Sequence, residues 1–457
     1  MSERKELSHS SRRDFLKTTG VASAGLATFG SLSPARSANA SGSEVINVAL
    51  VGCGGRGMGS LMDRFAVGDN MKVVAVADVA KKTAERAAET LAKMEDKKDK
   101  IDLSPDRVFG GFNCYKSAVE CADLVLIASP PAFHPDHYLY AVEKGKHVFI
   151  EKPFGVDAEG YRRCMRANKI AEEKGLTVCA GFQRRHEKSY INWISRIHDG
   201  LIGDIVSTRV YWNGGGAKVR GVRGDGEPEM SFQVRDWYFF NWLSGDHIVE
   251  QHCHNIDVGN WIHGKGDPLA HPVSCIGMGG RQVRKTPKFP YNECGNIFDH
   301  HYVEYRFADG TVMHSQCRQI PSCWNGVTEK VDGTKGHGGT GWLQPTGGER
   351  WEYPKRSGDK SAYVQEHINQ AEAMREGKKL HDGWFAATST MTAVMGWMAT
   401  YSGKEIKWED AIARGKTIFP YDKELSYDME APVMPGPDGT YEQAVAVPGQ
   451  YDPYDKS

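Results

Sequence analysis

The sequence lacks a strong excess of charge of either sign. Its 457 residues include 57 lysines and arginines and 58 aspartates and glutamates, which gives a formal net charge of −1. Nucleic-acid binding depends on a basic surface that neutralises phosphate, so we expect no nucleic-acid partner. Hydrophobic residues at 40% and charged residues at 25% are typical of a globular protein, and the length favours two domains.

The sequence also lacks an apolar run long enough to cross a membrane, and it lacks a regular cysteine pattern. Its ten cysteines are irregularly spaced, and no Cys-x-x-Cys occurs. We therefore interpret most of them as buried thiols rather than as a disulfide framework. No cysteine closely follows the short apolar segment near the start, so we expect no membrane anchor once that segment has been removed.

That short apolar segment, residues 21–29, has the surroundings of an export signal. The paired residues Arg12 and Arg13 precede it, and the small residues 38–40 follow it as a cleavage site. The arginine pair followed by Phe-Leu-Lys resembles the twin-arginine type of signal. We predict that residues 1–40 are a twin-arginine signal peptide and that the mature protein is periplasmic or otherwise exported by this route.

What the sequence does contain is a strand that runs into a glycine-rich turn. The apolar residues 45–51 predict a buried strand of a parallel sheet. The following Gly-x-Gly-x-x-Gly pattern suits a tight turn in which backbone approaches a pyrophosphate at a helix N-terminus. In this loop we predict cofactor contacts from Gly52, Gly54, Gly55, Arg56 and Gly57. A second strand ends at Asp78, about 20 residues further on, where a carboxylate binds ribose hydroxyls and favours NAD over NADP.

Two further predicted strands, residues 122–128 and 146–150, end in polar and proline-rich turns. Ser129 and Pro130 follow the first, and Lys152 follows the second. Because the carboxyl ends of parallel strands lie at one edge of a sheet, we expect these residues beside the glycine loop. The proline after Lys152 restricts its backbone, so we expect this lysine to be oriented toward the site.

These motifs resemble those of the Gfo/Idh/MocA family. The resemblance rests on the glycine turn and on Ser129-Pro130-Pro131-x-x-His134, Glu151-Lys152-Pro153-Phe154-Gly155 and Ala180-Gly181-Phe182-Gln183-Arg184-Arg185-His186. It implies a nicotinamide-dependent oxidoreductase that acts on sugars, inositols or related polyols. It also implies that Lys152 lies near the nicotinamide and the reacting hydroxyl, and that His134 and Glu151 belong to the cofactor site.

The resemblance implies an α/β Rossmann domain followed by an α+β domain with a large, open, mainly antiparallel sheet. We place the NAD-binding domain at residues 44–185, the second domain at 186–430 and an extended tail at 431–457. Alternating residues 205–212 and a turn at Asp309-Gly310 agree with a sheet in the second domain. Residues 335–349, rich in glycine and charge, predict a loop. The sheet's free face would support a homo-oligomer, a dimer or a tetramer.

A second polar cluster lies at residues 244–261. On a continuous helix, Glu250, His254 and Asp257 would share one face, where two carboxylates could raise the basicity of the imidazole. This arrangement suits a base that takes a hydroxyl proton. In the family the corresponding pattern is Asp-x-x-x-His-x-x-Asp, so Glu250 departs from it.

The same cluster raises the alternative of a metal site. His252 and His254 would lie roughly 200° apart around a helix and could not both reach one ion, so we predict no metal. Another alternative is a buried helix with satisfied polar groups. For the substrate we predict contacts from Lys152, Arg185, Trp237, His254 and Asp257.

The function we predict is hydride transfer from a sugar hydroxyl carbon to a tightly bound NAD that is recycled on the exported enzyme. His254 would accept the hydroxyl proton, and Lys152 would stabilise the developing alkoxide. The first alternative is a redox-neutral, NAD-dependent glycoside hydrolase, and the second is a sugar-binding protein without activity. In each case the partner is a small carbohydrate.

Overall fold

The structure, a computed structural model, describes residues 45–216, 223–284, 295–354 and 358–455. The predicted signal peptide, residues 1–40, lies outside these residues. Within them, no helix combines the length and the apolar character that a membrane span requires.

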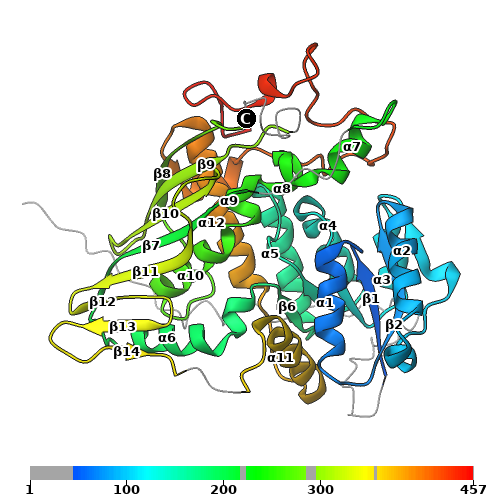
Figure 1. Cartoon of the computed structure of the whole chain (residues 1–457), viewed down its shortest axis with the longest axis horizontal. Helices are drawn as coiled ribbons and strands as arrows, with labels where there is room; N and C mark the ends of the chain where they lie inside the picture. The colour runs from blue at the N-terminus through cyan, green and yellow to red at the C-terminus, as the bar shows by residue number, and fades with distance from the viewer. Residues whose placement is uncertain (1–44, 217–222, 285–294, 355–357, 456–457) are drawn as a thin grey trace, which may run out of the picture. The chain divides into compact units, whose positions relative to one another are not determined.

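The first part of the described chain is a six-stranded sheet in which every strand pair is parallel. The strand order is β3-β2-β1-β4-β5-β6, so the order reverses beside β1. Its strands are β1 (Ile46–Val51), β2 (Met71–Asp78), β3 (Val108–Gly110), β4 (Leu124–Ile127), β5 (His147–Ile150) and β6 (Val178–Ala180). Their long apolar runs are buried because helices cover both faces of the sheet (Figure 1).

The helices of this part alternate with its strands. They are α1 (Gly55–Phe65), α2 (Lys81–Ala92), α3 (Cys114–Glu120), α4 (His134–Glu143) and α5 (Ala158–Glu173). Helix α2 shows why these segments are helical, since Ala84, Ala87 and Leu91 recur at helical spacing and are the residues that it buries. A ligand site is expected at the carboxyl edge between β1 and β4, where the strand order reverses.

The second sheet has nine strands in the order β14-β13-β12-β11-β7-β10-β9-β8-β15. Only β10 and β7 pair in parallel, so the sheet is mainly antiparallel. The longer strands are β7 (Ile205–Gly214), β8 (Ser274–Gly280), β9 (His300–Arg306), β10 (Val312–Gln319) and β11 (Gly326–Gly333). The edge strands are β12 (Gly336–Gly339), β13 (Trp342–Pro345), β14 (Trp351–Glu352) and β15 (Ile406–Lys407). The predicted fold class is therefore confirmed.

Two predictions for this sheet had opposite outcomes. The turn at Asp309-Gly310 does join β9 to β10, and Gly310 has a φ of +84°, which favours glycine. The predicted loop at residues 335–349 is wrong, because β12 and β13 pair there as a hairpin. Glycine is uncommon in strands, so the sequence of this segment does not look like a strand. Here the backbone pairing of β12 with β11 defines the strand, not an alternation of side chains.

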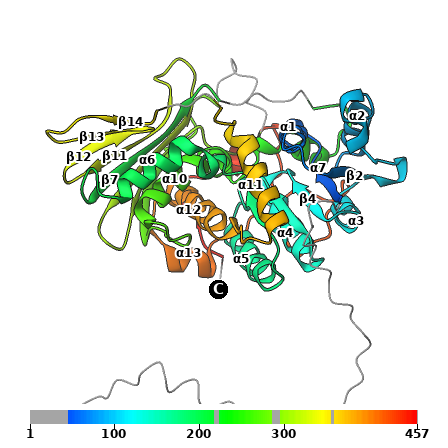
Figure 2. The ribbon, with the colours of Figure 1, turned by 90° about the horizontal axis from the view of Figure 1, so that it is seen from below.

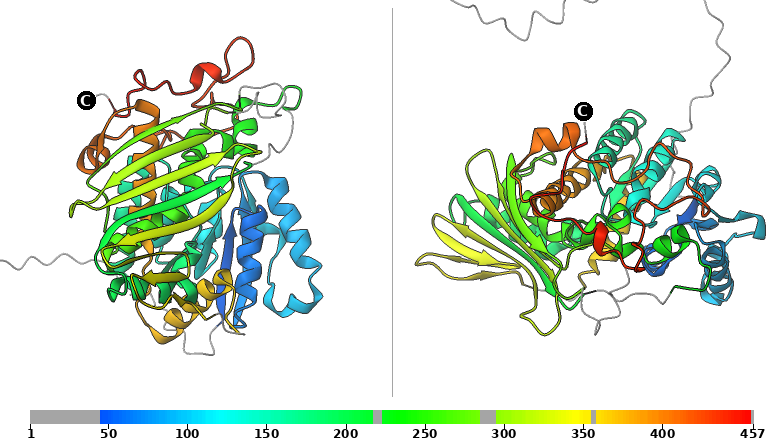
Figure 3. Two further views of the ribbon diagram at one scale, coloured as in Figure 1. Left: turned by 60° about the vertical axis from the view of Figure 1, so that its left-hand side comes forward. Right: turned by 90° about the horizontal axis from the view of Figure 1, so that it is seen from above.

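A layer of helices covers one face of the second sheet. It contains α6 (Lys188–His198), α10 (Cys253–Gly264) and α12 (Gly383–Ser402), which Figure 2 shows between the sheet and helix α5. Helix α12 is buried over almost its whole length. Figure 3 shows the opposite face of the sheet, which no described helix covers.

The remaining helices connect the two sheets. They are α7 (Glu229–Arg235), α8 (Asn241–Ser244), α9 (Asp246–Glu250), α11 (Ala362–Glu376) and α13 (Trp408–Arg414). Although α11 comes late in the chain, its Gln370 donates to the carbonyl of Val148 in β5 at 2.9 Å. The described part of the tail contains neither a long helix nor a strand, yet Tyr441 within it is buried. The predicted domain boundaries stay predictions.

Candidate active site

The glycine turn between β1 and α1 requires glycine at two positions. A Cβ on Gly57 would lie 1.9 Å from the carbonyl oxygen of Gly52, and a Cβ on Gly52 would lie 2.4 Å from the carbonyl carbon of Ala128. Gly52 also has a φ of +93°. At Gly54 an added Cβ would meet nothing within 4 Å, so this glycine leaves open space in front of the helix. The first turn of α1 therefore presents unobstructed N–H groups, which suit a pyrophosphate.

Asp78 ends β2 beside this turn. Its carboxylate accepts the backbone N–H of Cys53 and of Ala80, each at 2.9 Å. These bonds fix the carboxylate at the rim of a cavity of about 500 Å³. The cavity, the turn and Asp78 together fit the adenosine and pyrophosphate of a dinucleotide.

The cavity contains most of the predicted cofactor residues. The predicted residues that line it are Gly52, Gly54, Gly55, Arg56, Asp78, Ser129 and Pro130. Sequence reasoning missed His137, whose Nδ1 lies 3.0 Å from the hydroxyl of Ser129. It also missed Tyr427 from the far end of the chain, which no local pattern could have assigned to this site.

His134 does not line the cavity. It is buried, and its ring nitrogens lie 2.7 Å from the carbonyl oxygens of Ser129 and Pro153. Burial lowers its pKa to about 4, although the two carbonyl contacts oppose this shift. The prediction of a direct cofactor contact is therefore corrected, because this histidine instead joins the two loops that carry Ser129 and Lys152.

Glu151 is also buried behind the cavity wall. Its Oε1 lies 2.8 Å from Nε of Arg56, which does line the cavity. Burial raises the pKa of Glu151, although the guanidinium opposes this shift. Its predicted cofactor contact is thus indirect: it orients Arg56 beside the glycine turn.

Lys152 reaches across to the second half of the chain. Its Nζ donates to the Glu250 backbone carbonyl at 2.5 Å and to Glu250 Oε1 at 2.9 Å. Burial alone would lower the pKa of Lys152, but Glu250 and the other neighbouring groups, Glu151 among them, together outweigh burial and the pKa is raised. The lysine is therefore held as a cation at the carboxyl end of β5.

The predicted helix through Glu250, His254 and Asp257 is interrupted. Glu250 ends α9 and His254 lies in the first turn of α10, so the three side chains do not share one helix face. The carboxylate of Glu250 binds Lys152, and that of Asp257 binds Arg185 at 2.8 and 2.9 Å. The prediction of two carboxylates that flank the imidazole is wrong.

His254 lies instead among aromatic rings. The ring of Trp212 stacks on it with centroids 5.9 Å apart, and Phe182 meets it edge-on at 5.8 Å. Burial, and then the charge of nearby Lys152, hold the pKa of His254 well below its usual value of 6.5. Its Nδ1 is buried and has no hydrogen-bond partner among the described residues.

Three other residues were predicted to contact the substrate: Arg185, Asp257 and Trp237. The structure gives each of them different neighbours. Arg185 and Asp257 form a two-pronged ion pair, and Ser389 donates to the same carboxylate at 2.8 Å. This arrangement stabilises the packing of α10 and α12. Trp237 lines the nucleotide cavity, which is not the place that the predicted substrate contact requires.

A buried ion pair, which the sequence did not predict, joins Arg184 to strand β11. Arg184 donates to Glu329 on β11 at 2.5 Å, and the same carboxylate accepts from Asn255 of α10 at 2.5 Å. Glu329 is fully buried. In an alternating strand such a glutamate looks like an exposed residue, so no local pattern marks it as buried.

The comparisons with known proteins agree with the first part of this site. Residues 46–182 match the Gfo/Idh/MocA family, described as an oxidoreductase family with an NAD-binding Rossmann fold. The match supports the predicted family.

An inositol 2-dehydrogenase/D-chiro-inositol 3-dehydrogenase of Halalkalibacterium halodurans is 34% identical over 30% of this chain and 36% of its own. A 2,7-anhydro-N-acetylneuraminate hydratase of Escherichia coli is 26% identical over 42% of this chain and 50% of its own. The chain thus spans between a third and a half of these relatives. A levoglucosan dehydrogenase solved with NADH and levoglucosan has a TM-score of 0.61 at 16% identity, covering 80% of this chain and 99% of the other, which shows a shared fold.

Proposed function

We propose that this protein is an exported, NAD-dependent oxidoreductase that acts on a sugar or a sugar derivative. The observation that carries the proposal is the Lys152–Glu250 contact at the carboxyl end of β5. It places a cation beside His254, at the same sheet edge as the nucleotide cavity. The relatives that act on inositols and on a sugar acid support the substrate class.

The chemistry divides between two side chains. When bound, NAD⁺ supplies the acceptor for a hydride from the substrate's carbinol carbon. His254 is neutral, so it accepts the hydroxyl proton, and Lys152 donates a hydrogen bond to the oxygen on which negative charge develops. Glu250 orients Lys152 and keeps it charged, which is the role we propose for this glutamate in place of aspartate.

We propose NAD rather than NADP as the cofactor. The carboxylate of Asp78, anchored by two backbone N–H groups, would repel a 2′-phosphate. Lys82 and Arg86 also line this end of the cavity, and their positive charge reduces the discrimination. Measured NAD and NADP contents of the purified protein test this preference directly.

We further propose that the cofactor is resident. The outer wall of the cavity includes Ser231 and Val234 of α7, the following Trp237, and Tyr427. The hydroxyl of Tyr427 donates to the carbonyl of Val79 at 3.0 Å, and Figure 1 shows the late chain segment beside α7. This cover, which we define as α7, Trp237 and Tyr427, supports slow release, as an exported enzyme without a cofactor supply requires.

A redox-neutral reaction is the second candidate, and the hydratase among the relatives favours it. Such a reaction would need a bound NAD to take a hydride and return it within one turnover; His254 would move a proton, and Lys152 would donate a hydrogen bond to the substrate's hydroxyl or carbonyl oxygen. The same cavity and the same side chains serve both candidates, so the geometry alone supports each. The products distinguish them.

One experiment tests both candidates. The purified protein is denatured and the released NAD(H) is measured, and the intact protein is then given free sugars, inositols and chromogenic glycosides without added cofactor. Sugar-dependent reduction of bound NAD supports the dehydrogenase, and glycoside cleavage without net NADH supports the redox-neutral reaction. Absence of released NAD(H) together with absence of turnover would refute the proposal.

Export and assembly are tested separately. Replacing Arg12 and Arg13 by lysine should retain the protein in the cytoplasm if the twin-arginine route is used. For assembly we propose a homo-oligomer, a dimer or a tetramer, through the uncovered face of the second sheet, where Met278 is 72% and Ile276 is 44% exposed. Light scattering measures the mass of the wild type and of Met278→Lys, and the variant should be smaller. A monomeric wild type would contradict the proposed homo-oligomer.

A further inference from the structure

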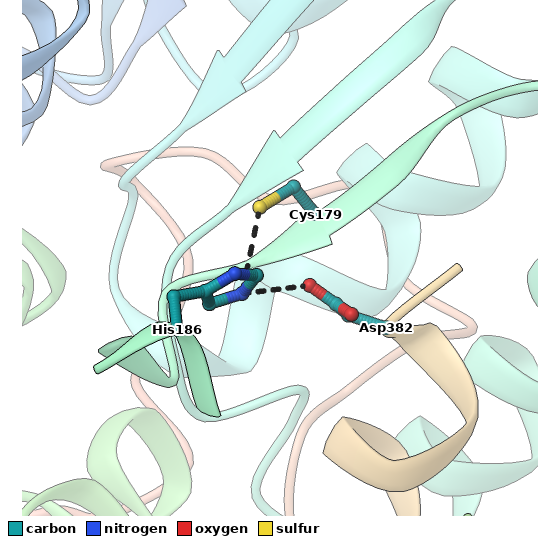
Figure 4. Close-up of side chains that lie close together, drawn as sticks. All are labelled: Cys179, His186 and Asp382. Atoms are coloured by element: carbon teal, nitrogen blue, oxygen red, sulfur yellow. Dashed lines mark hydrogen bonds and ion pairs between the residues drawn. The ribbon is translucent and has the colours of Figure 1, made fainter. Parts of the chain in front are cut away.

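Two clusters of buried side chains have a spacing that could hold a metal ion. The first is Cys179, His186 and Asp382, shown in Figure 4 with the histidine ring between the thiol and the carboxylate. The Nε2 of His186 lies 3.2 Å from Asp382, and its Nδ1 lies 2.9 Å from the amide nitrogen of Asn369. Both ring nitrogens are engaged, so hydrogen bonds within the protein satisfy this cluster.

The second cluster is Asp246, His247 and His301, which are fully buried in the second domain. Oδ2 of Asp246 lies 3.3 Å from Nε2 of His301, and Oδ1 lies 3.9 Å from Nε2 of His247. The two imidazole rings are 4.8 Å apart between centroids. The carboxylate and His247 come from α9 and His301 from β9, so the cluster joins a helix to the sheet.

This second cluster contains polar atoms that the protein does not satisfy. Neither ring nitrogen of His247 has a hydrogen-bond partner in the described ranges of the chain, and Nε2 of His301 has only its 3.3 Å contact with the Asp246 carboxylate. A buried polar group without a partner destabilises a fold, so native proteins rarely leave both nitrogens of a buried ring unpaired. The contrast with His186 is direct, because there every ring nitrogen is engaged.

The outer partners of the cluster hold it in an orientation suited to a ligand set. The Nδ1 of His301 lies 2.9 Å from the hydroxyl of Thr400, which leaves Nε2 directed at Asp246. The hydroxyl of Tyr401 donates to Oδ2 of Asp246 at 2.6 Å. Hydrogen bonds of this kind to the second nitrogen and to the carboxylate are the usual companions of a metal-binding histidine and aspartate.

We propose that Asp246, His247 and His301 bind a divalent transition ion of the zinc class. Two imidazoles and a carboxylate are ligands that zinc accepts, with bonds of about 2.0–2.2 Å that place ligand atoms roughly 3.3–3.5 Å apart. The observed 3.3 Å and 3.9 Å separations need only small side-chain movements to reach this geometry. This proposal departs from the sequence-based prediction, which assigned no metal site to the chain.

The charges around the cluster are compatible with a cation. The carboxylate of Asp246 would supply the negative charge for a bound cation, and the two imidazoles would supply nitrogen ligands. Arg284 lies nearby, but its guanidinium donates to the Phe298 carbonyl at 3.1 Å and to the Gln319 side chain at 2.5 Å.

The metal would position the active site rather than take part in the chemistry. Gly245 and Asp246 both have positive φ angles, +70° and +65°, and Asp246 is not a glycine, so this turn is strained. Helix α9 runs from this turn to Glu250, which binds Lys152. An ion that ties Asp246 to His301 would stabilise the turn and thereby the Lys152–Glu250 contact. This inference does not depend on which reaction the enzyme performs.

The test measures metal in the full-length protein, purified without a chelator or a histidine tag from zinc-supplemented cells. We expect about one zinc per chain by mass spectrometry, and a visible ligand-field spectrum after exchange for Co²⁺. His301→Gln and His247→Gln should each lose the metal, whereas the matched His186→Gln in the first cluster should keep it.

Two outcomes would overturn the proposal. One is a wild-type protein that carries no zinc above background and gives no Co²⁺ spectrum, which would identify the cluster as an Asp246–His301 ion pair. The other is equal loss of metal from the His186→Gln control, which would place the ion in the first cluster. The wild-type Co²⁺ spectrum decides the question even if a variant fails to fold.

Discussion

The two halves of the candidate site differ in how they are built. In the first, Asp78 ends β2 and Lys152 follows β5 of the same parallel sheet, so both lie at its carboxyl edge. In the second, the helix expected through residues 250–257 is broken between α9 and α10. Positions at strand ends thus follow from topology, whereas positions on a helix face depend on where that helix begins.

The largest effect is expected at the contact that joins the two halves. Lys152→Ala should lower kcat by about 10²–10³-fold, because it removes the donor to the developing alkoxide. Bound NAD content should stay near the wild-type level, because Lys152 does not line the nucleotide cavity. Lys146→Ala, in the turn before the same strand, is the control. A variant with full turnover would remove Lys152 from the mechanism.

His254 tests the second half. His254→Ala should lower kcat by about 10²-fold or more through loss of the base. Because its folded pKa lies well below 6.5, the wild-type imidazole stays neutral as the pH falls through 6.5. Wild-type turnover should therefore be flat from neutral pH through this value and decline only in more acidic buffer. A half-maximal rate at pH 6.5 would instead indicate an ordinary exposed histidine.

The glycine turn separates folding from cofactor binding. Gly57→Ala places a Cβ 1.9 Å from the Gly52 carbonyl oxygen. Overpacking of this kind destabilises a fold by about 1–3 kcal/mol, and we expect at least this loss here. Gly54→Ala meets no neighbouring atom, so its thermal stability should match the wild type while its NAD content falls. Equal melting temperatures for both variants would contradict the close approach at Gly57.

The Arg185–Asp257 pair tests the corrected interpretation of the second half. Asp257→Asn leaves a half-buried guanidinium without its carboxylate, and breaking such a pair destabilises a fold by about 3–5 kcal/mol. We expect a lower melting temperature and an unchanged KM for the sugar. An increase in KM at unchanged stability would restore the original prediction that these residues bind substrate.

These differences define what the sequence could predict. The glycine turn and the strands that end near Asp78, Ser129 and Lys152 are visible as local patterns, whereas the complete fold class follows from the family resemblance. The Glu329 ion pair and the contribution of Tyr427 to the cavity join residues far apart in the chain, so no local signal exists for them. His134 and Glu151 were assigned to the correct loops but not to their partners, because burial of a particular side chain is not encoded in a motif.

The smallest effect is expected at the cover of the nucleotide cavity, where residues from both halves meet. Tyr427→Ala removes the bond to the Val79 carbonyl and a ring packed 5.0 Å from Phe112, while the glycine turn and Asp78 remain. Release of NAD should accelerate by roughly tenfold, as expected for the loss of about 1–1.5 kcal/mol, with little change in kcat for the loaded enzyme. Tyr427→Phe keeps the ring but loses the hydroxyl, so its rate of NAD release should lie between that of the wild type and that of Tyr427→Ala. If release is unchanged in both variants, then retention depends on the first domain alone, and the cover contributes only to the packing of α7.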